Sequence, residues 1–231
     1  MNERVIRLGN ECAEFSRSWV GEAASLLERA TVVVHPTETV HGLGCRYDCR
    51  AAIERIAQLK GRKEPGRMIL LVPGPLWLDT LCNEVPDVAR KLARHFWPGP
   101  LTLVLKTADS ARRKVPWLGT TVALRQCGHP FTSRVVEKLG LPVVSTSFNL
   151  TGQQAEHSDP QRNLEILAEG WKKKGLALPE LAVMDRNISG QESLPSTILA
   201  VRTGGPLLLL REGVIGVEEI KARAMTEVVT E

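Results

Sequence analysis

Apolar and polar positions follow two different periods along this chain, and their alternation predicts strands separated by amphipathic helices. Short β-branched or aliphatic runs that are bounded by Gly, Pro or polar residues are typical of buried strands. Such runs predict strands at 31–34, 68–72, 101–106, 121–125, 142–145, 181–185, 196–201 and 207–211.

Between these runs, apolar residues recur three or four positions apart, which is the spacing of one helix face. This spacing predicts helices near 19–27, 50–60, 75–82, 86–96, 129–140, 160–170 and 217–225. The alternation indicates an α/β fold with a mixed sheet, because several neighbouring strands have no helix between them. The chain shows no internal repeat and no linker, so we expect a single domain over residues 1–231 and no second domain.

At 231 residues, 43% of them apolar, the chain is long enough to bury a core without a disulfide or metal staple. Its five cysteines are scattered and odd in number, which is typical of reduced thiols in a cytoplasmic protein. The first residues lack the apolar stretch of a secretory signal, and no apolar run reaches the ~18–20 residues that span a bilayer. We therefore expect a cytoplasmic protein without a membrane partner.

The formal net charge of +4 favours anionic ligands only weakly. Readers of single-stranded RNA stack bases on aromatic side chains, whereas this chain has one tyrosine and five dispersed tryptophans. Composition alone therefore leaves RNA binding open.

Candidate chemistry begins with the stretch HPTETVHGLG at 35–44, which follows the first predicted strand. Thr37 and Thr39 offer hydroxyls, and Glu38 between them is expected to point the opposite way if the backbone is extended. Gly42 and Gly44 permit close backbone approach. The stretch predicts a binding site for a polar ligand at the end of the strand. The alternative is a strand-to-helix turn that carries polar residues without binding a ligand.

A basic pair, Lys60-Gly-Arg62, stands at the end of a predicted helix. Lysine as a point charge and arginine as a bidentate donor can clamp adjacent phosphates. The alternative is a basic helix C-terminus that complements the helix dipole.

Polar residues also lie at the ends of three later predicted strands. Ser145-Thr146-Ser147-Phe148-Asn149 comes after an apolar run, at the strand end where open α/β sheets place ligands, although a Ser/Asn-rich turn would read the same. Ser196-Thr197 leads into ILAV, and Arg211 closes LLLL. An arginine in that position points at an anion or lies on the surface.

Other classes of site find little support. Cys45 and Cys49, with His35 and His41 nearby, lack the paired spacing of a zinc site. The chain contains no Walker A sequence, no GxGxxG and no GxSxG. We therefore expect no metal ligands from the protein.

In order, the segments PTETVHGLG, LKGR, WPGPLTLVL, TVALR, PVVSTSFN, PSTI and LREG make the chain resemble the YrdC-like family of threonylcarbamoyl-adenylate synthases, over about residues 20–215. The resemblance implies a twisted α/β sheet with a basic concave cavity. It implies synthesis of threonylcarbamoyl-AMP and pyrophosphate from L-threonine, bicarbonate and ATP, with magnesium accompanying the ATP. A separate transferase would then modify the adenosine next to the anticodon in tRNA; direct tRNA contact stays open.

The same resemblance assigns residues to ligands. It implies a threonine site made of Thr37, Thr39, Arg125, Ser147 and Ser196. It implies an ATP site made of Lys60, Arg62, Thr121, Asn149 and Arg211. The reaction needs no protein nucleophile, so Lys60 and Arg62 would act through positioning and charge stabilisation.

The chain departs from the family pattern in three places. His41 stands where the family usually has tyrosine, residues 63–68 lack the family's usual proline-containing segment, and Leu70 or Leu71 fills a polar position. Two alternatives therefore stay open: a related carbamoyl-adenylate-forming enzyme, and a non-catalytic RNA-binding protein on the same fold.

Overall fold

The computed structural model describes residues 4–8, 17–63, 68–150, 160–185, 188 and 194–230. Its strands are β1 (Arg4–Leu8), β2 (Val33–His35), β3 (Gly42–Arg46), β4 (Ile69–Leu71), β5 (Leu101–Lys106), β6 (Thr121–Arg125), β7 (Val143–Ser147), β8 (Leu181–Asp185), β9 (Thr197–Ala200), β10 (Leu207–Arg211) and β11 (Val228–Thr230). Its helices are α1 (Arg17–Glu28), α2 (Arg50–Leu59), α3 (Trp77–Leu81), α4 (Asp87–Phe96), α5 (Asp109–Lys114), α6 (Pro130–Leu139), α7 (Pro160–Lys173) and α8 (Val217–Ala224).

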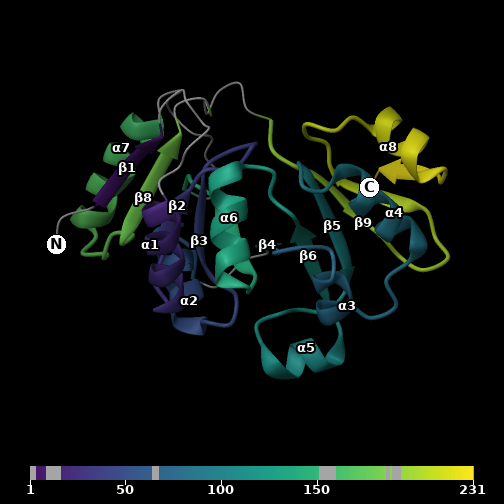
Figure 1. The fold of residues 1–231 in the computed structure, drawn as a ribbon, viewed down its shortest axis with the longest axis horizontal. Helices are drawn as coiled ribbons and strands as arrows, with labels where there is room; N and C mark the ends of the chain where they lie inside the picture. The colour runs from purple at the N-terminus through teal and green to yellow at the C-terminus, as the bar shows by residue number, and fades with distance from the viewer. Residues whose placement is uncertain are drawn as a thin grey trace.

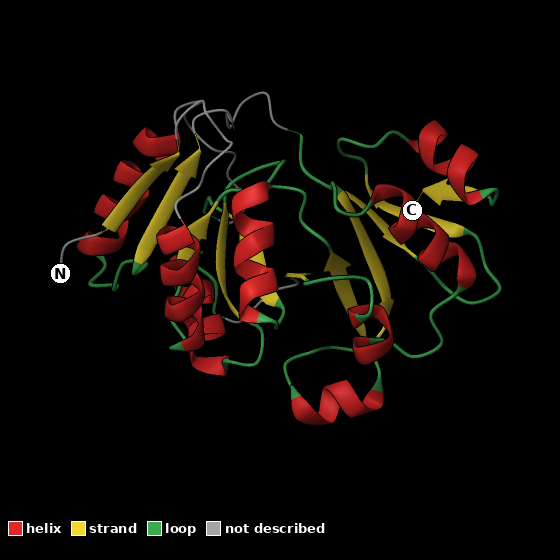
Figure 2. Cartoon of the chain, in the orientation of Figure 1, coloured by secondary structure: helices red, strands yellow, loops and turns green. Residues whose placement is uncertain are grey.

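Within these ranges the strands form one sheet in the order β1-β8-β2-β3-β7-β4-β6-β5-β9-β10-β11. The sheet contains parallel pairs, such as β2 with β8 and β5 with β9, and antiparallel pairs, such as β3 with β7 and β5 with β6. The predicted α/β class with a mixed, twisted sheet is therefore confirmed. In Figures 1 and 2, β1, β8 and β2 lie at one end of the molecule and β5 and β9 at the other, with α6 between them.

The helices bury their apolar faces at separate places on the sheet. Helices α1 and α6 pack against each other, and their apolar residues form one cluster with β1, β2 and β8. A second, larger cluster includes apolar residues of α2, α4, α7 and α8. Helix α6 begins at Pro130, whose fixed φ suits the first helical turn. It is capped at its C-terminus by Gly140, which has a φ of 68°. Its N-terminus therefore follows the end of β6 after a four-residue connection.

Four elements were absent from the sequence-based prediction, namely β1, β3, α5 and β11. Strand β1 is a short run with two arginines, and β11 has only three residues, so neither gives a clear period of two. Helix α5, with the sequence DSARRK, buries only Ala111 among its residues, so it has no apolar stripe to detect.

The stretch 35–44 is a hairpin connection, so its interpretation as a strand-to-helix turn was wrong. Strand β2 pairs antiparallel with β3, and His35 lies opposite Gly42. A Cβ atom added at Gly42 or at Gly44 would come within 2.8 Å of the His35 ring. These two glycines therefore make room for an imidazole, which is a packing role.

The serine-rich motif also lies in regular structure. Ser145 and Ser147 belong to β7 and pair with Gly44 and Gly42 of β3. The interpretation of this motif as a turn is thus wrong as far as Ser147, and only Phe148 and Asn149 lie beyond the strand. Across the described residues, no helix combines the length and the apolar character that crossing a membrane requires.

Candidate active site

Arg125, the last residue of β6, is the centre of a buried hydrogen-bonded group. Its Nη1 and Nη2 each donate to Thr39 Oγ1 at 3.2 Å, and its Nε donates to Gly99 O at 3.2 Å. Nη2 also lies 2.9 Å from Glu38 Oε1. The structure therefore brings the arginine that follows TVAL to the PTET segment, 86 residues away in sequence.

Glu38 lies on the same side as Thr39, which contradicts the expectation that it points away. Residues 38–40 form a bend, so the alternation of an extended chain does not apply there. Glu38 also accepts from Gly128 N–H at 2.9 Å and from the Cys127 thiol at 3.1 Å. Burial would raise the pKa of Glu38, but the charge and hydrogen bonds of Arg125 outweigh burial and hold its pKa below the usual value.

Thr37 and Thr39 direct their hydroxyls at protein atoms. Thr37 Oγ1 donates to Val40 O at 2.6 Å and accepts from the backbone N–H groups of Thr39 and Val40 at 3.2 and 3.1 Å. The two threonine oxygens lie 2.9 Å apart, and because the Thr37 proton goes to Val40 O, a hydrogen bond between them has Thr39 as the donor and shares a Thr37 lone pair with a backbone N–H. Thr39 then presents its lone pairs to Arg125, so both hydroxyls orient the arginine.

Lys60 joins two motifs that are distant in sequence. It follows α2 and is 2% exposed, and its Nζ donates to Ser147 O at 2.5 Å and to Asn149 Oδ1 at 2.7 Å. Burial, with a smaller contribution from the charge of Arg62, lowers the pKa of Lys60 to about 7. The Ser147 hydroxyl donates to Asn149 Oδ1 at 2.6 Å. The lysine of the K-x-R pair therefore meets the S-x-N pair directly.

A second arginine is held in the same manner at the end of β10. Arg211 donates to Ser196 O from Nε at 3.0 Å and from Nη2 at 2.8 Å, and to Ser196 Oγ from Nη2 at 3.0 Å. Ser196 Oγ lies 2.9 Å from Thr102 Oγ1. Burial, and then the positive charge of Arg125, lowers the pKa of Arg211. The two arginines therefore lie within each other's electric field.

Of the two remaining predicted residues, Thr121 stands apart from these groups, whereas the charge of Arg62 acts on Lys60. Thr121 is exposed at the first position of β6, at the opposite end of that strand from Arg125. Arg62 is half-buried beyond the end of α2, with its backbone N–H bonded to Ala57 O at 2.8 Å. The segment 64–67 that follows, including Arg67, lies outside the described residues.

A set of buried histidines lies beside the candidate site, and none of them was assigned a role in it from the sequence. His41 Nε2 accepts from Asp185 N–H at 3.0 Å, and His129 Nε2 lies 3.0 Å from Asp185 Oδ2. Burial lowers the pKa of His41 and of His35 to about 4, so both rings are neutral at pH 7. Thr102 was missed as well, although it stands in the WPGPLT segment that carried the resemblance.

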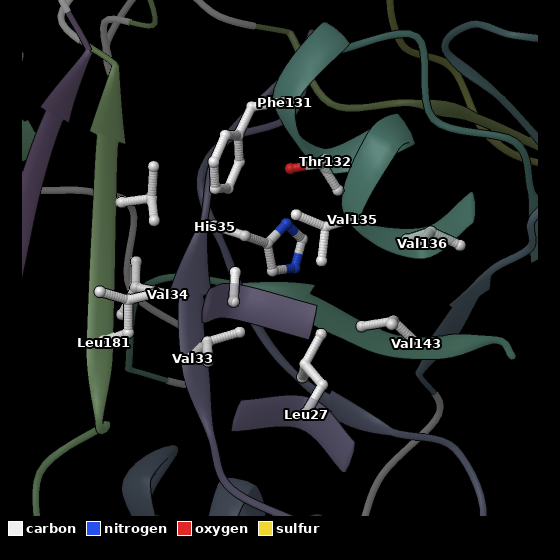
Figure 3. Close-up of a pocket in the computed structure, with 12 residues that line it drawn as sticks. Leu27, Val33, Val34, His35, Phe131, Thr132, Val135, Val136, Val143 and Leu181 are labelled. Carbon is white, nitrogen blue, oxygen red and sulfur yellow. The ribbon is translucent and has the colours of Figure 1, made fainter. Parts of the chain in front are cut away.

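A separate cavity lies between α1, α6, β2 and β8. Figure 3 shows the His35 ring near Phe131, Thr132 and Val135, with valines and leucines around the rest of the wall. Among the described residues, no lysine or arginine lines it. It is therefore not the basic cavity that the resemblance implies, and that cavity stays a prediction.

Metal ligation by the protein finds no support in the described part of the chain. There, no group of three or more His, Cys, Asp or Glu side chains is placed to hold a metal ion. Three of the described thiols are also unsuited to nucleophilic attack. Burial raises the pKa of Cys82 to about 12 and raises the pKa of Cys45 and Cys127 further.

Comparison with known proteins shows which family this chain matches. The Sua5/YciO/YrdC family model, described as "Telomere recombination", matches residues 25–213. The threonylcarbamoyl-AMP synthase of Pyrococcus abyssi is 32% identical over 202 residues, which is 86% of this chain and 55% of that protein. The one from Nitrosococcus oceani is 34% identical over 186 residues, or 79% of this chain and 92% of that protein. This chain spans about half the length of the P. abyssi relative.

Solved structures agree with the fold. P. abyssi Sua5 in complex with L-threonine superposes with a TM-score of 0.78 at 28% identity, covering 99% of this chain and 63% of that one. Escherichia coli YciO gives a TM-score of 0.72 at 24% identity and covers 95% of this chain and 98% of that one, a likeness of fold alone.

Proposed function

The chain belongs to the Sua5/YciO/YrdC family, and from this premise we propose that it is a threonylcarbamoyl-AMP synthase. Its substrates would be L-threonine, bicarbonate and ATP, and its products threonylcarbamoyl-AMP and pyrophosphate. The observation that carries the proposal is a set of three cations, the buried Lys60 and Arg125 and the more exposed Arg211, each hydrogen-bonded to a side chain of the implied ligand sites. Such a set suits a reaction whose reactants each carry an anionic group.

Arg125 is the residue that we assign to the carboxylate of L-threonine. Thr39, Glu38 and Gly99 hold its guanidinium in one orientation. Among the described residues, Nη1 donates to Thr39 Oγ1 with one of its two hydrogens, which leaves the other for a ligand oxygen. Binding would place the threonine amine for attack on the carbon of bicarbonate or carbon dioxide, which yields a carbamate.

Lys60, Arg62 and Arg211 would hold ATP for the second step. A carbamate oxygen attacks the α-phosphorus, the bond to the β-phosphate breaks, and pyrophosphate leaves with the electron pair. Negative charge accumulates on the phosphate oxygens, so fixed cations stabilise the transition state more than the ground state. No protein nucleophile takes part. Magnesium would enter as the counter-ion of ATP, held chiefly by the phosphates.

The proposal extends to the fate of the product. Threonylcarbamoyl-AMP is a mixed anhydride that would pass to a separate transferase, which modifies the adenosine beside the anticodon in tRNA. This places the protein in the cytoplasm, where tRNA is processed. Direct tRNA contact by this chain is not required by the chemistry.

The direct test is detection of the product. We expect the purified protein, given MgATP, bicarbonate and L-threonine, to form a species with the mass of threonylcarbamoyl-AMP, and to form none when threonine is replaced by alanine. Absence of this species from folded, ATP-binding protein would contradict the proposal. Tight, salt-sensitive tRNA binding in that case would favour the non-catalytic alternative.

A further inference from the structure

The buried pair Thr102 and Ser196 raises a question that packing does not answer. Thr102 is the second residue of β5 and is 0% exposed; Ser196, just before β9, is 1% exposed. Strands β5 and β9 run parallel, with Leu101 opposite Thr197, so the two hydroxyls meet between neighbouring strands. A valine would fill the position of Thr102 equally well in the apolar run LTLVL. Burial of a hydroxyl costs free energy unless it is hydrogen-bonded, so this one calls for a reason.

Counting protons shows which direction of the bond between them a ligand would favour. Among the described residues, the one hydrogen-bond partner of Thr102 Oγ1 is Ser196 Oγ, at 2.9 Å, and either oxygen can be the donor in the free protein. If Ser196 donated, the Thr102 proton would stay buried without an acceptor, whereas if Thr102 donates, a ligand oxygen beside Ser196 satisfies both protons. A bound ligand therefore selects Thr102 as the donor. Ser196 Oγ thus accepts one bond from Thr102 and a second from Arg211 Nη2 at 3.0 Å.

With both lone pairs occupied, the Ser196 hydroxyl has only its proton left to offer. Within the described part of the chain, no acceptor is bonded to that proton. The other hydroxyl pair behaves differently, since the Thr39 proton goes to Thr37 and its lone pairs go to Arg125. Among these hydroxyls, Ser196 is thus the one set to donate to a ligand.

We propose that Thr102 is a positioning residue: by donating to Ser196 Oγ, it directs the Ser196 proton toward an oxygen of L-threonine. This inference rests on the proposed function, because that function places Ser196 at the threonine site. Thr102 does not touch the substrate; it acts by removing the alternative in which Ser196 donates to the protein. The arrangement works together with Arg211, which fills the other lone pair of the same oxygen.

The test compares three variants of the full chain by calorimetric titration with L-threonine and with MgATP. Thr102→Val keeps the shape and removes the proton, and Thr102→Ser restores a hydroxyl. Thr107→Val is the matched control, because Thr107 is also buried, at the end of β5, but its hydroxyl has no hydrogen-bond partner among the described residues.

We expect Thr102→Val to weaken threonine binding about fivefold to tenfold, the scale of one hydrogen bond, with MgATP affinity unchanged within twofold. Thr102→Ser and Thr107→Val should bind threonine as the wild type does. Unchanged threonine affinity in Thr102→Val, or a loss confined to MgATP, would overturn the inference. Failure of the wild type itself to bind threonine would overturn the proposed function, and this inference with it.

A double-mutant cycle separates positioning from a general loss of stability. If Thr102 acts through Ser196, then Ser196→Ala and the double variant Ser196→Ala/Thr102→Val should bind threonine equally weakly. Additive losses in the double variant would show that Thr102 acts by another route. The cycle stays informative even if Thr102→Val lowers the melting temperature, because both proteins compared lack the Ser196 hydroxyl.

Discussion

The Arg125 guanidinium is paired with the Glu38 carboxylate, with Nη2 and Oε1 2.9 Å apart and the arginine side chain only 5% exposed. The pair explains how a cation can be held in the interior of the protein before any substrate binds. It also fixes the bend at 38–40 against the connection that leads into α6, through the bond from Gly128 N–H. The structural role and the proposed binding role of Arg125 thus depend on the same carboxylate.

Replacing Glu38 with alanine should leave the buried charge of Arg125 without a partner. Loss of one member of a buried pair costs about 3 kcal/mol, so we expect a reduction of that size in the free energy of unfolding, measured with urea. Glu180→Ala is the control, because Glu180 also accepts from an arginine (Arg55 Nη1, 2.5 Å) and from a backbone N–H (Val32, 3.1 Å) in a more exposed setting. An equal loss in the two variants would contradict this account.

The lowered pKa of Lys60 predicts that protons are taken up when ATP binds. Its pKa is lowered to about 7 in the free protein, so at pH 8 most of its amines are neutral. Phosphate groups favour the charged form and raise the pKa, so binding of ATP at pH 8 should take up protons. Calorimetry in two buffers of different ionisation enthalpy measures this uptake. Lys60→Arg, which stays charged, should show less uptake, and equal uptake in both proteins would argue against the assignment.

The neutral histidines make the fold sensitive to acid. The pKa of His41 is about 4 when folded and about 6.5 when unfolded, so the unfolded chain binds more protons between these values. Stability is therefore retained above pH 6.5 and lost as the pH falls toward 4, by roughly 3 kcal/mol for this ring. His41→Gln keeps an acceptor for Asp185 N–H and should reduce the loss. An unchanged pH profile of urea unfolding would contradict this cause.

Gly42 should tolerate no side chain. A Cβ there would come within 2.8 Å of the His35 ring and of Ser145 Oγ, so Gly42→Ala should lower the free energy of unfolding by about 2 kcal/mol. Gly74→Ala is the control, because a Cβ at Gly74 meets nothing within 4 Å. Thermal melting of both variants gives the comparison, and equal melting temperatures would show that the hairpin can adjust.

The spacing of apolar residues in the sequence was sufficient to predict much of the fold. The predicted strands 101–106 and 121–125 are β5 and β6 to the residue, because their apolar runs are bounded by breakers and charges. Periodicity could not find α5, whose polar sequence buries one alanine, nor recognise that 35–44 turns back into β3. Gly42 and Gly44 resemble loop residues in the sequence, and only the position of His35 explains them.

For the site, the motifs identified the cations but not what surrounds them. Lys60 was picked from a basic pair at a helix end, Arg211 from its place at the end of an apolar strand, and Arg125 from the family resemblance. The partners that hold them depend on contacts between distant segments, such as Glu38 with Gly128 and Thr102 with Ser196. Whether a hydroxyl donates or accepts depends on contacts between distant segments. The sequence therefore could not distinguish a hydroxyl that binds the ligand from one that orients a neighbouring side chain.

The most direct test of the central claim is release of pyrophosphate from MgATP and bicarbonate, with and without L-threonine, by the wild type and by Arg125→Ala. The account predicts release that depends on threonine, with the apparent KM for threonine raised at least tenfold in the variant and the KM for ATP little changed. Release that ignores threonine, or that is equal in the two proteins, would contradict it.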